Sequence, residues 1–277
     1  MKRTKFLSVA AACLLFTTIY SCKSNETENV AENKADISTS TLEKVKSLGF
    51  STENIRKING GYLVEGDILL TEANLSESET GAKLNIAETE QYRTTNTVKS
   101  LPRVITVSVT NLPQVYSDAV NTMISRYNSL GLRITFQRAS AGTTGNINVV
   151  GFNEAASGGF ITLGSAGFPT SSGNPYNEIR MNTNSAAYGS NPNQLYLASV
   201  IQHEVGHCIG FRHTDYMNRA FSCGSSGAGN EGASNVGAVL IPGTPSTPDA
   251  ASFMLACSNG GNRTFNSNDV VALNYIY

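Results

Sequence analysis

All three histidines of this 277-residue chain lie within eleven positions, in the segment HEVGHCIGFRH that begins at His203. His203 and His207 are four residues apart, so on an α-helix their imidazoles project from one face, about 40° apart and roughly 6 Å along the axis. Gly210 can take the left-handed conformation that ends a helix, which would turn His213 back toward the same point. Three neutral imidazoles with an open fourth position are typical of a catalytic Zn²⁺ site, so the segment predicts one zinc ion held by these histidines.

We expect the helix that carries this segment to run from Pro192 to Cys208 or Ile209. Asn191 can cap its N-terminus, Pro192 suits the first turn, and Gln194 stands where a capping box needs it. The helix also has an apolar stripe, which we expect to face the core and to leave the histidines free for a metal. This stripe consists of Leu197, Ile201, Val205 and Cys208.

Glu204 follows the first histidine and points about 100° further around the helix, so it is poorly placed as a ligand but well placed beside a water on the metal. Zinc lowers the pKa of such a water to about 7, and Glu204 could take its proton during attack on a carbonyl. The same carboxyl could then deliver the proton to a departing amine. The residues therefore predict hydrolysis of a peptide bond, with Glu204 as general base.

The charge balance excludes two classes of partner. The chain has 20 basic and 21 acidic residues, so no basic surface for nucleic acid or an anionic membrane is expected. No feature indicates oligomerisation, and we expect a monomer that acts on a protein or peptide substrate.

The N-terminus has the pattern of an export signal. A basic start precedes the uncharged stretch Phe6–Ile19, which is too short to span a bilayer, and residues 1–21 are predicted to be a signal peptide. The sequence IYSC that ends at Cys22 resembles the lipobox of bacterial lipoproteins, so Cys22 would carry a lipid that is the only membrane contact. The alternative is ordinary secretory cleavage nearby. We expect an exported cell-envelope lipoprotein that is surface-exposed or released.

The rest of the chain divides by pattern. Residues 22–40 are polar and predict a flexible tether, and residues 41–101 predict a leader or pro-region with a linker, outside the main core. Residues 102–277 predict the catalytic domain, in which one strand, one helix and several strands indicate an α+β fold with a mixed sheet. The expected elements are strands at 105–109, 132–136, 146–152, 159–163 and 178–182, and a helix between Pro113 and Gly131.

The extended histidine motif is similar to that of the metzincin zinc endopeptidases, and HEVGH followed by GFRHTDY most resembles the bacterial dual-action HEIGH metallopeptidases. The resemblance covers roughly residues 102–277. It implies a two-subdomain zincin with a mixed five-stranded sheet, an active-site helix, a cleft between the halves and a closing helix at 265–277. Residues 224–250 would build part of the substrate wall, unless they are only a surface loop.

The segment SFMLAC at 252–257 is similar to the methionine turn of this clan, which implies that Met254 lies below the metal. Met217 is an alternative, but it follows the third histidine too closely for the chain to loop beneath the site. We expect Cys223 and Cys257 to form a disulfide that ties the two segments together, with Cys208 free, although spacing alone does not fix the pairing. Asp215 is expected to make a local hydrogen bond or ion pair.

The leader contains Glu65-Gly66-Asp67, which resembles the switch of astacin pro-segments, where an aspartate blocks the metal. Asp67 would then confer latency, because a carboxylate is a competent zinc ligand. The alternative, which the pattern favours, is a turn between strands of an accessory module. For the whole chain, the leading hypothesis is a secreted zinc-dependent endopeptidase. The alternative is a non-catalytic surface binding protein on a metzincin scaffold.

Overall fold

The computed structural model describes residues 37–76, 91–156, 159–224, 231, 237–245 and 247–277. All of them belong to the unit Ala31–Tyr277, one of the two units into which the chain divides. The predicted signal peptide, Cys22, most of the predicted tether, and residues 225–230, 232–236 and 246 of the predicted substrate wall lie outside the described residues. Within the described part of the chain, no helix combines the length and the apolar character needed to cross a bilayer.

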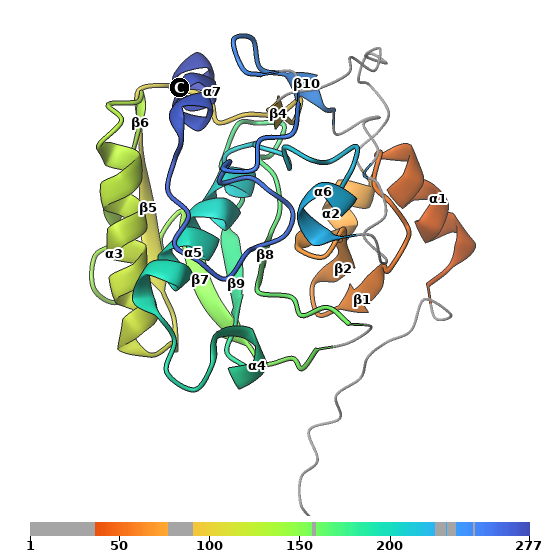
Figure 1. Cartoon of the computed structure of the whole chain (residues 1–277), viewed down its shortest axis with the longest axis horizontal. Helices are drawn as coiled ribbons and strands as arrows, with labels where there is room; N and C mark the ends of the chain where they lie inside the picture. Colours follow the sequence, from red (N-terminus) through yellow and green to blue (C-terminus); the bar gives the residue numbers. More distant parts are fainter. Residues whose placement is uncertain (1–36, 77–90, 157–158, 225–230, 232–236, 246) are drawn as a thin grey trace, which may run out of the picture. The chain divides into compact units, whose positions relative to one another are not determined.

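An eight-stranded mixed sheet is the framework of the described chain, in the order β1-β2-β3-β8-β9-β7-β5-β6 (Figure 1). Strands β5, β6, β7 and β9 are parallel, β8 is antiparallel to β9, and β3 is parallel to β8. Five strands come from beyond Pro102, as the resemblance implies. The strands are β1 (Arg56–Ile58), β2 (Gly61–Val64), β3 (Ile68–Leu70), β5 (Arg103–Val109), β6 (Ile134–Arg138), β7 (Ile147–Phe152), β8 (Gly164–Ala166) and β9 (Glu178–Asn182). A separate two-stranded sheet joins β4 (Tyr92–Arg93) to β10 (Val239–Leu240).

Two long helices pack on each other and on the sheet: α3 (Gln114–Asn128) and α5 (Gln194–Cys208) (Figure 1). The apolar stripe of α5 is fully buried as predicted, because it faces α3 and the strands β8 and β9. The predicted α+β class, with a mixed sheet, a motif-bearing helix and a C-terminal helix, is therefore confirmed. The remaining helices are α1 (Thr39–Ser47), α2 (Glu72–Ser76), α4 (Ser185–Tyr188), α6 (Ala220–Cys223) and α7 (Ser267–Ile276).

The start of α5 differs from the prediction. The cap is Asn193, whose side chain accepts hydrogen bonds from the backbone of the first turn, and not Asn191. Pro192 therefore precedes the helix. Gln194 makes no capping box, because its amide donates instead to the carbonyl of Asp118 and the hydroxyl of Thr122 on α3.

The predicted strand at 159–163 is also displaced. The strand β8 begins directly after the predicted segment, while residues 160–163 line a cavity. Their apolar side chains gave the segment the appearance of a buried strand. The other four strands lie within two residues of their predicted positions, and the helix α3 begins directly after Pro113.

The predicted leader has its own apolar cluster, formed by residues between Ile37 and Leu75 together with Phe168 from the loop after β8. Its strand β3 nevertheless hydrogen-bonds to β8, and α1 begins inside the segment predicted to be a tether. Residues 91–101 behave differently, since Val98 belongs to the main core. The division of the chain at residue 102 remains a prediction.

Candidate active site

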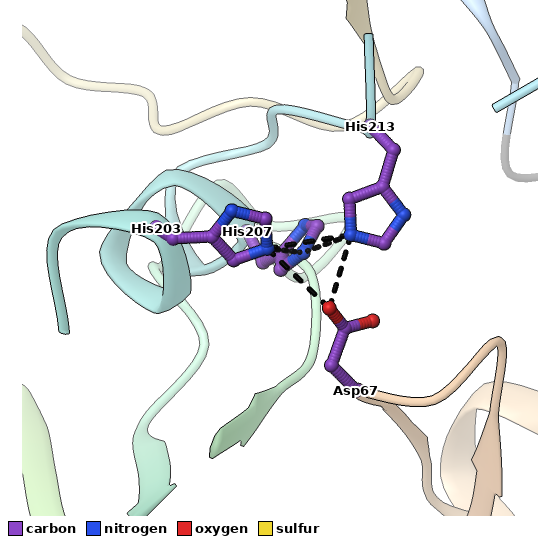
Figure 2. Close-up of side chains that lie close together, drawn as sticks. All are labelled: Asp67, His203, His207 and His213. Atoms are coloured by element: carbon purple, nitrogen blue, oxygen red, sulfur yellow. Dashed lines mark hydrogen bonds and ion pairs between the residues drawn. The ribbon is translucent and has the colours of Figure 1, made fainter. Parts of the chain in front are cut away.

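Helix α5 and the turn after it bring the three histidines together (Figure 2). The Nε2 atoms are 3.0 Å apart for His203 and His207, 3.2 Å for His207 and His213, and 3.3 Å for His203 and His213. Gly210 makes the turn possible with a φ of +108°, a conformation that side chains with a Cβ rarely adopt. His207 and His213 are fully buried, and His203 is nearly so.

The hydrogen bonds of the rings show which nitrogen faces the centre. Each Nδ1 has an acceptor: Phe253 O for His203 at 2.8 Å, Phe211 O for His207 at 2.9 Å and the Glu231 carboxylate for His213. Carbonyl and carboxylate oxygens accept hydrogen bonds, so each Nδ1 carries a proton, and neutral rings would turn their Nε2 lone pairs toward one another. Such lone pairs repel unless they share a cation. A tetrahedral zinc with Zn–N bonds of about 2.0–2.1 Å would place these nitrogens about 3.3 Å apart, so the three rings fit the ion.

Asp67 supplies a fourth atom at this centre. Its Oδ2 lies 3.1 Å from Nε2 of His213 and 3.4 Å from Nε2 of His203 (Figure 2). Burial alone would raise the pKa of Asp67, but the imidazoles hold it well below its usual value. Asp67 stands at the turn between β2 and β3, so the sequence pattern that favoured a turn missed that the turn also reaches the histidines.

The surroundings shift the pKa values of His207 and His213 in opposite directions. Burial and the two neighbouring imidazoles lower the pKa of His207 well below its usual value. Burial also disfavours protonated His213, but the carboxylates of Asp67 and Glu231 outweigh it and raise the pKa of His213 well above its usual value. His207 is therefore held as a neutral ring, whereas positive charge is stabilised at His213.

Glu204 is buried beside the three histidines, where α5 packs against β8. Its Oε2 has no hydrogen-bond partner among the described residues, and a Cβ on Gly164 would lie 2.7 Å from its Oε1. Burial raises the pKa of Glu204 well above its usual value, and the charge of Asp67 raises it further. A raised pKa makes a carboxylate a better proton acceptor near neutral pH. The arrangement allows acid–base chemistry next to the three imidazoles.

Met254 lies against α5 on the side of Gly206, where any Cβ would collide with the methionine sulfur. Its carbonyl accepts a hydrogen bond of 2.9 Å from the backbone of Thr214, next to the third histidine. Met217, the alternative, is 37% exposed, whereas Met254 is fully buried. The methionine therefore supports the helix between the two histidines that it carries.

A cavity of about 480 Å³ opens beside His203. Residues 160–163 before β8 line one side, and residues 255–258 after Met254 line another. Residues 53–56 and 65–67 of the predicted leader line it too, so the leader borders the space that a substrate would need.

The family model described as dual-action HEIGH metallo-peptidase matches residues 62–277. The chain belongs to this family. It is a metallopeptidase, and the resemblance inferred from the motif is confirmed.

None of the curated proteins matches the sequence. Among solved structures, a structure of myroilysin is 18% identical with a TM-score of 0.42, covering 67% of this chain and 97% of its own. A crystal structure of myroilysin is 14% identical with a TM-score of 0.38, covering 74% of this chain and 95% of its own. High choriolytic enzyme 1, a hatching enzyme zinc-protease from Oryzias latipes, is 14% identical with a TM-score of 0.38, covering 62% and 88% respectively.

In the metallopeptidase, a disulfide and hydrogen bonds connect the segments around the three histidines. Cys223 and Cys257 form the predicted disulfide, and Cys208 is free and buried as expected. Asp215 accepts hydrogen bonds from the hydroxyl of Ser222 and the backbone of Ala256, which is the local role predicted for it. The loop after the third histidine is thereby fixed to the segment that follows Met254.

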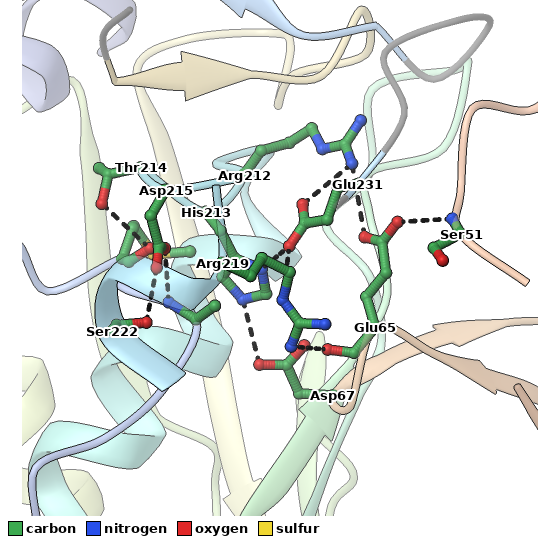
Figure 3. A network of polar contacts seen from close by, with 12 residues as sticks. Ser51, Glu65, Asp67, Arg212, His213, Thr214, Asp215, Arg219, Ser222 and Glu231 are labelled. Carbon is green, nitrogen blue, oxygen red and sulfur yellow. Dashed lines mark hydrogen bonds and ion pairs between the residues drawn. The ribbon is translucent and has the colours of Figure 1, made fainter. Parts of the chain in front are cut away.

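Sequence reasoning missed a buried group of charges behind the third histidine of the metallopeptidase (Figure 3). Arg212 lies between two carboxylates, with Nη2 3.1 Å from Oε2 of Glu231 and 3.5 Å from Oε2 of Glu65. Burial and Glu231 raise the pKa of Glu65 well above its usual value. Burial would also raise the pKa of Glu231, but His213 and Arg212 lower it to about 2, so Glu231 keeps its negative charge. No local motif surrounds Glu231 that could have identified it.

Proposed function

We propose that the chain is an exported zinc-dependent endopeptidase in which Glu204 is the general base. The observation that carries this proposal is the convergence of three Nε2 atoms within 3.0–3.3 Å beside a buried carboxylate, one oxygen of which has no hydrogen-bond partner in the described part of the chain. Of the metals that histidines bind, zinc best suits three imidazoles with one open position.

The residues have separate tasks in this mechanism. His203, His207 and His213 would hold the ion. When bound, zinc supplies Lewis acidity, which lowers the pKa of a water molecule and polarises a carbonyl. Glu204 takes the proton from the attacking water at its free oxygen and gives it to the nitrogen of the leaving amine. The cavity beside His203 accommodates the peptide on either side of the bond that is cut.

We expect the protein, after removal of the leader, to contain one zinc per chain and to hydrolyse casein and internally quenched peptides. A chelator should abolish hydrolysis, because it removes the zinc ion. The three neutral histidines act on a peptide only through that ion. Zinc content is measured by elemental analysis and hydrolysis by fluorescence. Chelator-resistant hydrolysis, or a purified protein without transition metal, would contradict the proposal.

We further propose that the leader keeps the enzyme latent in two ways. Oδ2 of Asp67 lies 3.1 Å from Nε2 of His213 and 3.4 Å from Nε2 of His203, so this carboxylate would compete with a water for an ion held by the histidines. Strand β3 pairs with β8, and the backbone N–H of Ala166 donates to Asp67 O at 3.0 Å. The leader therefore occupies a strand edge to which an extended peptide could otherwise hydrogen-bond. Both contacts would have to be lost before a substrate could enter.

We propose that the catalytic body begins at or before Gln91 and not at residue 102. Gln91 donates to Asp269 at 2.5 Å, the backbone of Arg212 donates to Tyr92 O at 2.8 Å, and the backbone of Val98 donates to the hydroxyl of Tyr277 at 3.1 Å. Tyr92 and Val98 are each only 2% exposed.

A chain of residues 91–277 is therefore expected to fold, whereas a chain of residues 102–277 should be less stable by about 3–6 kcal/mol, since it loses the burial of Tyr92 and Val98. Urea unfolding followed by circular dichroism measures the difference. Equal unfolding midpoints for the two chains would place residues 91–101 in a dispensable linker.

We also propose that the chain is exported and anchored by lipid on Cys22, which follows a basic and apolar N-terminus. Mass spectrometry of the N-terminal peptide from membranes should find a diacylglycerol adduct on Cys22, and Cys22→Ser should release the protein. An unmodified mature N-terminus would favour ordinary secretory cleavage.

A further inference from the structure

The three metal-binding histidines differ in what holds their outer nitrogen. His203 and His207 donate to backbone carbonyls, which the fold fixes in place. His213 donates to a side chain, the carboxylate of Glu231, which stands 18 residues later in the sequence. His213 is also the one ligand that lies outside the helix, so its ring has no helical backbone to set its direction.

We propose that Glu231 is a positioning residue for His213. A carboxylate at Nδ1 fixes the tautomer that presents Nε2 to the metal, and it orients the ring. Its negative charge also makes Nε2 a stronger electron donor than a carbonyl partner would. The contribution of Glu231 is therefore to metal affinity and ligand geometry, and it does not touch the substrate.

Glu231 is itself held from three sides. Arg212 reaches its Oε2 at 3.1 Å, and Nε of Arg219 lies 3.4 Å from its Oε1. The backbone N–H of Glu231 donates to Tyr216 O at 2.8 Å. The side chains of Arg212 and Glu231 are completely buried, so water does not screen this arrangement.

Arg212 is confined as well as charged. Its guanidinium lies 5.2 Å from the ring centre of Phe50 and 5.6 Å from that of Tyr216, and its Nη1 donates to Gly237 O at 3.3 Å. Without Glu231, this fixed cation would stand behind His213 with no carboxylate between them. Loss of the carboxylate should therefore weaken cation binding at Nε2 by removing attraction and by leaving a positive charge.

The leader contributes a second carboxylate, Glu65, to the same arginine. Once the leader is removed, Glu65 is gone, whereas the contact between Glu231 and Arg212 is kept. Glu231 should therefore matter more to the processed enzyme than to the latent chain.

This inference rests on the proposed zinc site and is tested by metal binding. Glu231→Gln, Glu231→Asp and the parent are compared by competition with a zinc chelator, in the full chain and in processed protein. We expect about a 10–100-fold loss of zinc affinity in Glu231→Gln. Glu231→Asp, which keeps the charge, should recover part of the loss. The control is Glu178→Gln, which breaks another carboxylate–arginine pair at 2.7 Å to Arg180 and should leave affinity unchanged.

A merely structural role is separated by two further readouts. With Co²⁺ in place of zinc, the visible spectrum should shift in Glu231→Gln, because it reports the geometry of the ligands. At saturating zinc, kcat should fall while KM stays constant. Thermal unfolding of the metal-free parent and of metal-free Glu231→Gln shows whether the substitution damages the fold. If it does, Glu231→Asp is compared with the parent instead. Equal zinc affinity and equal Co²⁺ spectra in parent and Glu231→Gln would overturn the proposal. A parent that binds no zinc would instead overturn the proposed function.

Discussion

The Glu204→Gln variant of the processed enzyme is expected to hydrolyse peptides about 10²–10⁴-fold more slowly than the parent while it keeps its zinc. Glutamine has nearly the shape of glutamate but cannot accept the proton of the attacking water. The substitution should leave the fold intact, because Oε2 of Glu204 has no hydrogen-bond partner among the described residues. The loss should therefore appear in kcat, with little change in KM or in metal content.

This result is measured with an internally quenched peptide and with elemental analysis of the same samples. An added protease should remove the leader from both proteins, so that parent and variant are compared in the same processed form. His213→Ala is the matched control, because it should lose zinc as well as activity. Unchanged turnover in Glu204→Gln would refute the assigned base. A parent that binds zinc and peptides but cuts none would favour the alternative of a surface binding protein.

The Asp67→Ala variant of the full chain is expected to cleave substrate without processing, whereas the full-length parent should be latent. Truncation of one partner in a buried charge-assisted contact costs about 2–5 kcal/mol, which corresponds to roughly a 30–4,000-fold shift toward the open form. Asp67 is well suited to this role because its Oδ2 lies within 3.4 Å of two imidazole nitrogens. Asp67→Asn should be intermediate, since an amide keeps the shape but not the charge.

The measurement is initial hydrolysis rate, with mass spectrometry confirming that the chain is still uncut. The double variant Asp67→Ala/Glu204→Gln shows whether the new activity comes from this site. Glu53→Ala is the matched control, because Glu53 belongs to the leader and lines the same cavity without contacting the histidines. Equal latency in Asp67→Ala and the parent would remove the idea of a switch at Asp67.

The convergence of the three histidines was predictable because the information for it is local. A spacing of four residues places His203 and His207 on one face of any α-helix, and Gly210 permits the turn that returns His213. These three ligands need only one helix and one turn to meet. The same locality explains why most strands and the helix α5 were found.

The start of α5 was wrong because a distant contact decided it. Asn191 and Asn193 both suit a cap, and the sequence offered a capping box for the first. The amide of Gln194 instead binds α3, 72 residues away at Thr122, so the helix begins later. A tertiary hydrogen bond outweighed a local preference of similar strength.

Glu231 could not have been predicted for a related reason. It stands in a segment rich in glycine, serine and alanine, where no periodicity gives its position. Its partners His213 and Arg212 stand 18 and 19 residues earlier, and Arg212 looked like an ordinary residue within the motif. The contact between Asp67 and the histidines spans 146 residues. Only the resemblance of Glu65-Gly66-Asp67 to the astacin switch suggested it, while the local pattern favoured a simple turn.

Because the leader has an apolar cluster of its own, cutting the chain would not by itself end inhibition. A detached leader would keep its own interior, apart from Phe168, and could bind again to the enzyme that it had left. Breaking the chain then turns an intramolecular contact into a bimolecular one, whose occupancy depends on concentration. In a confined space the two parts would remain together, and dilution into a large volume would set the enzyme free.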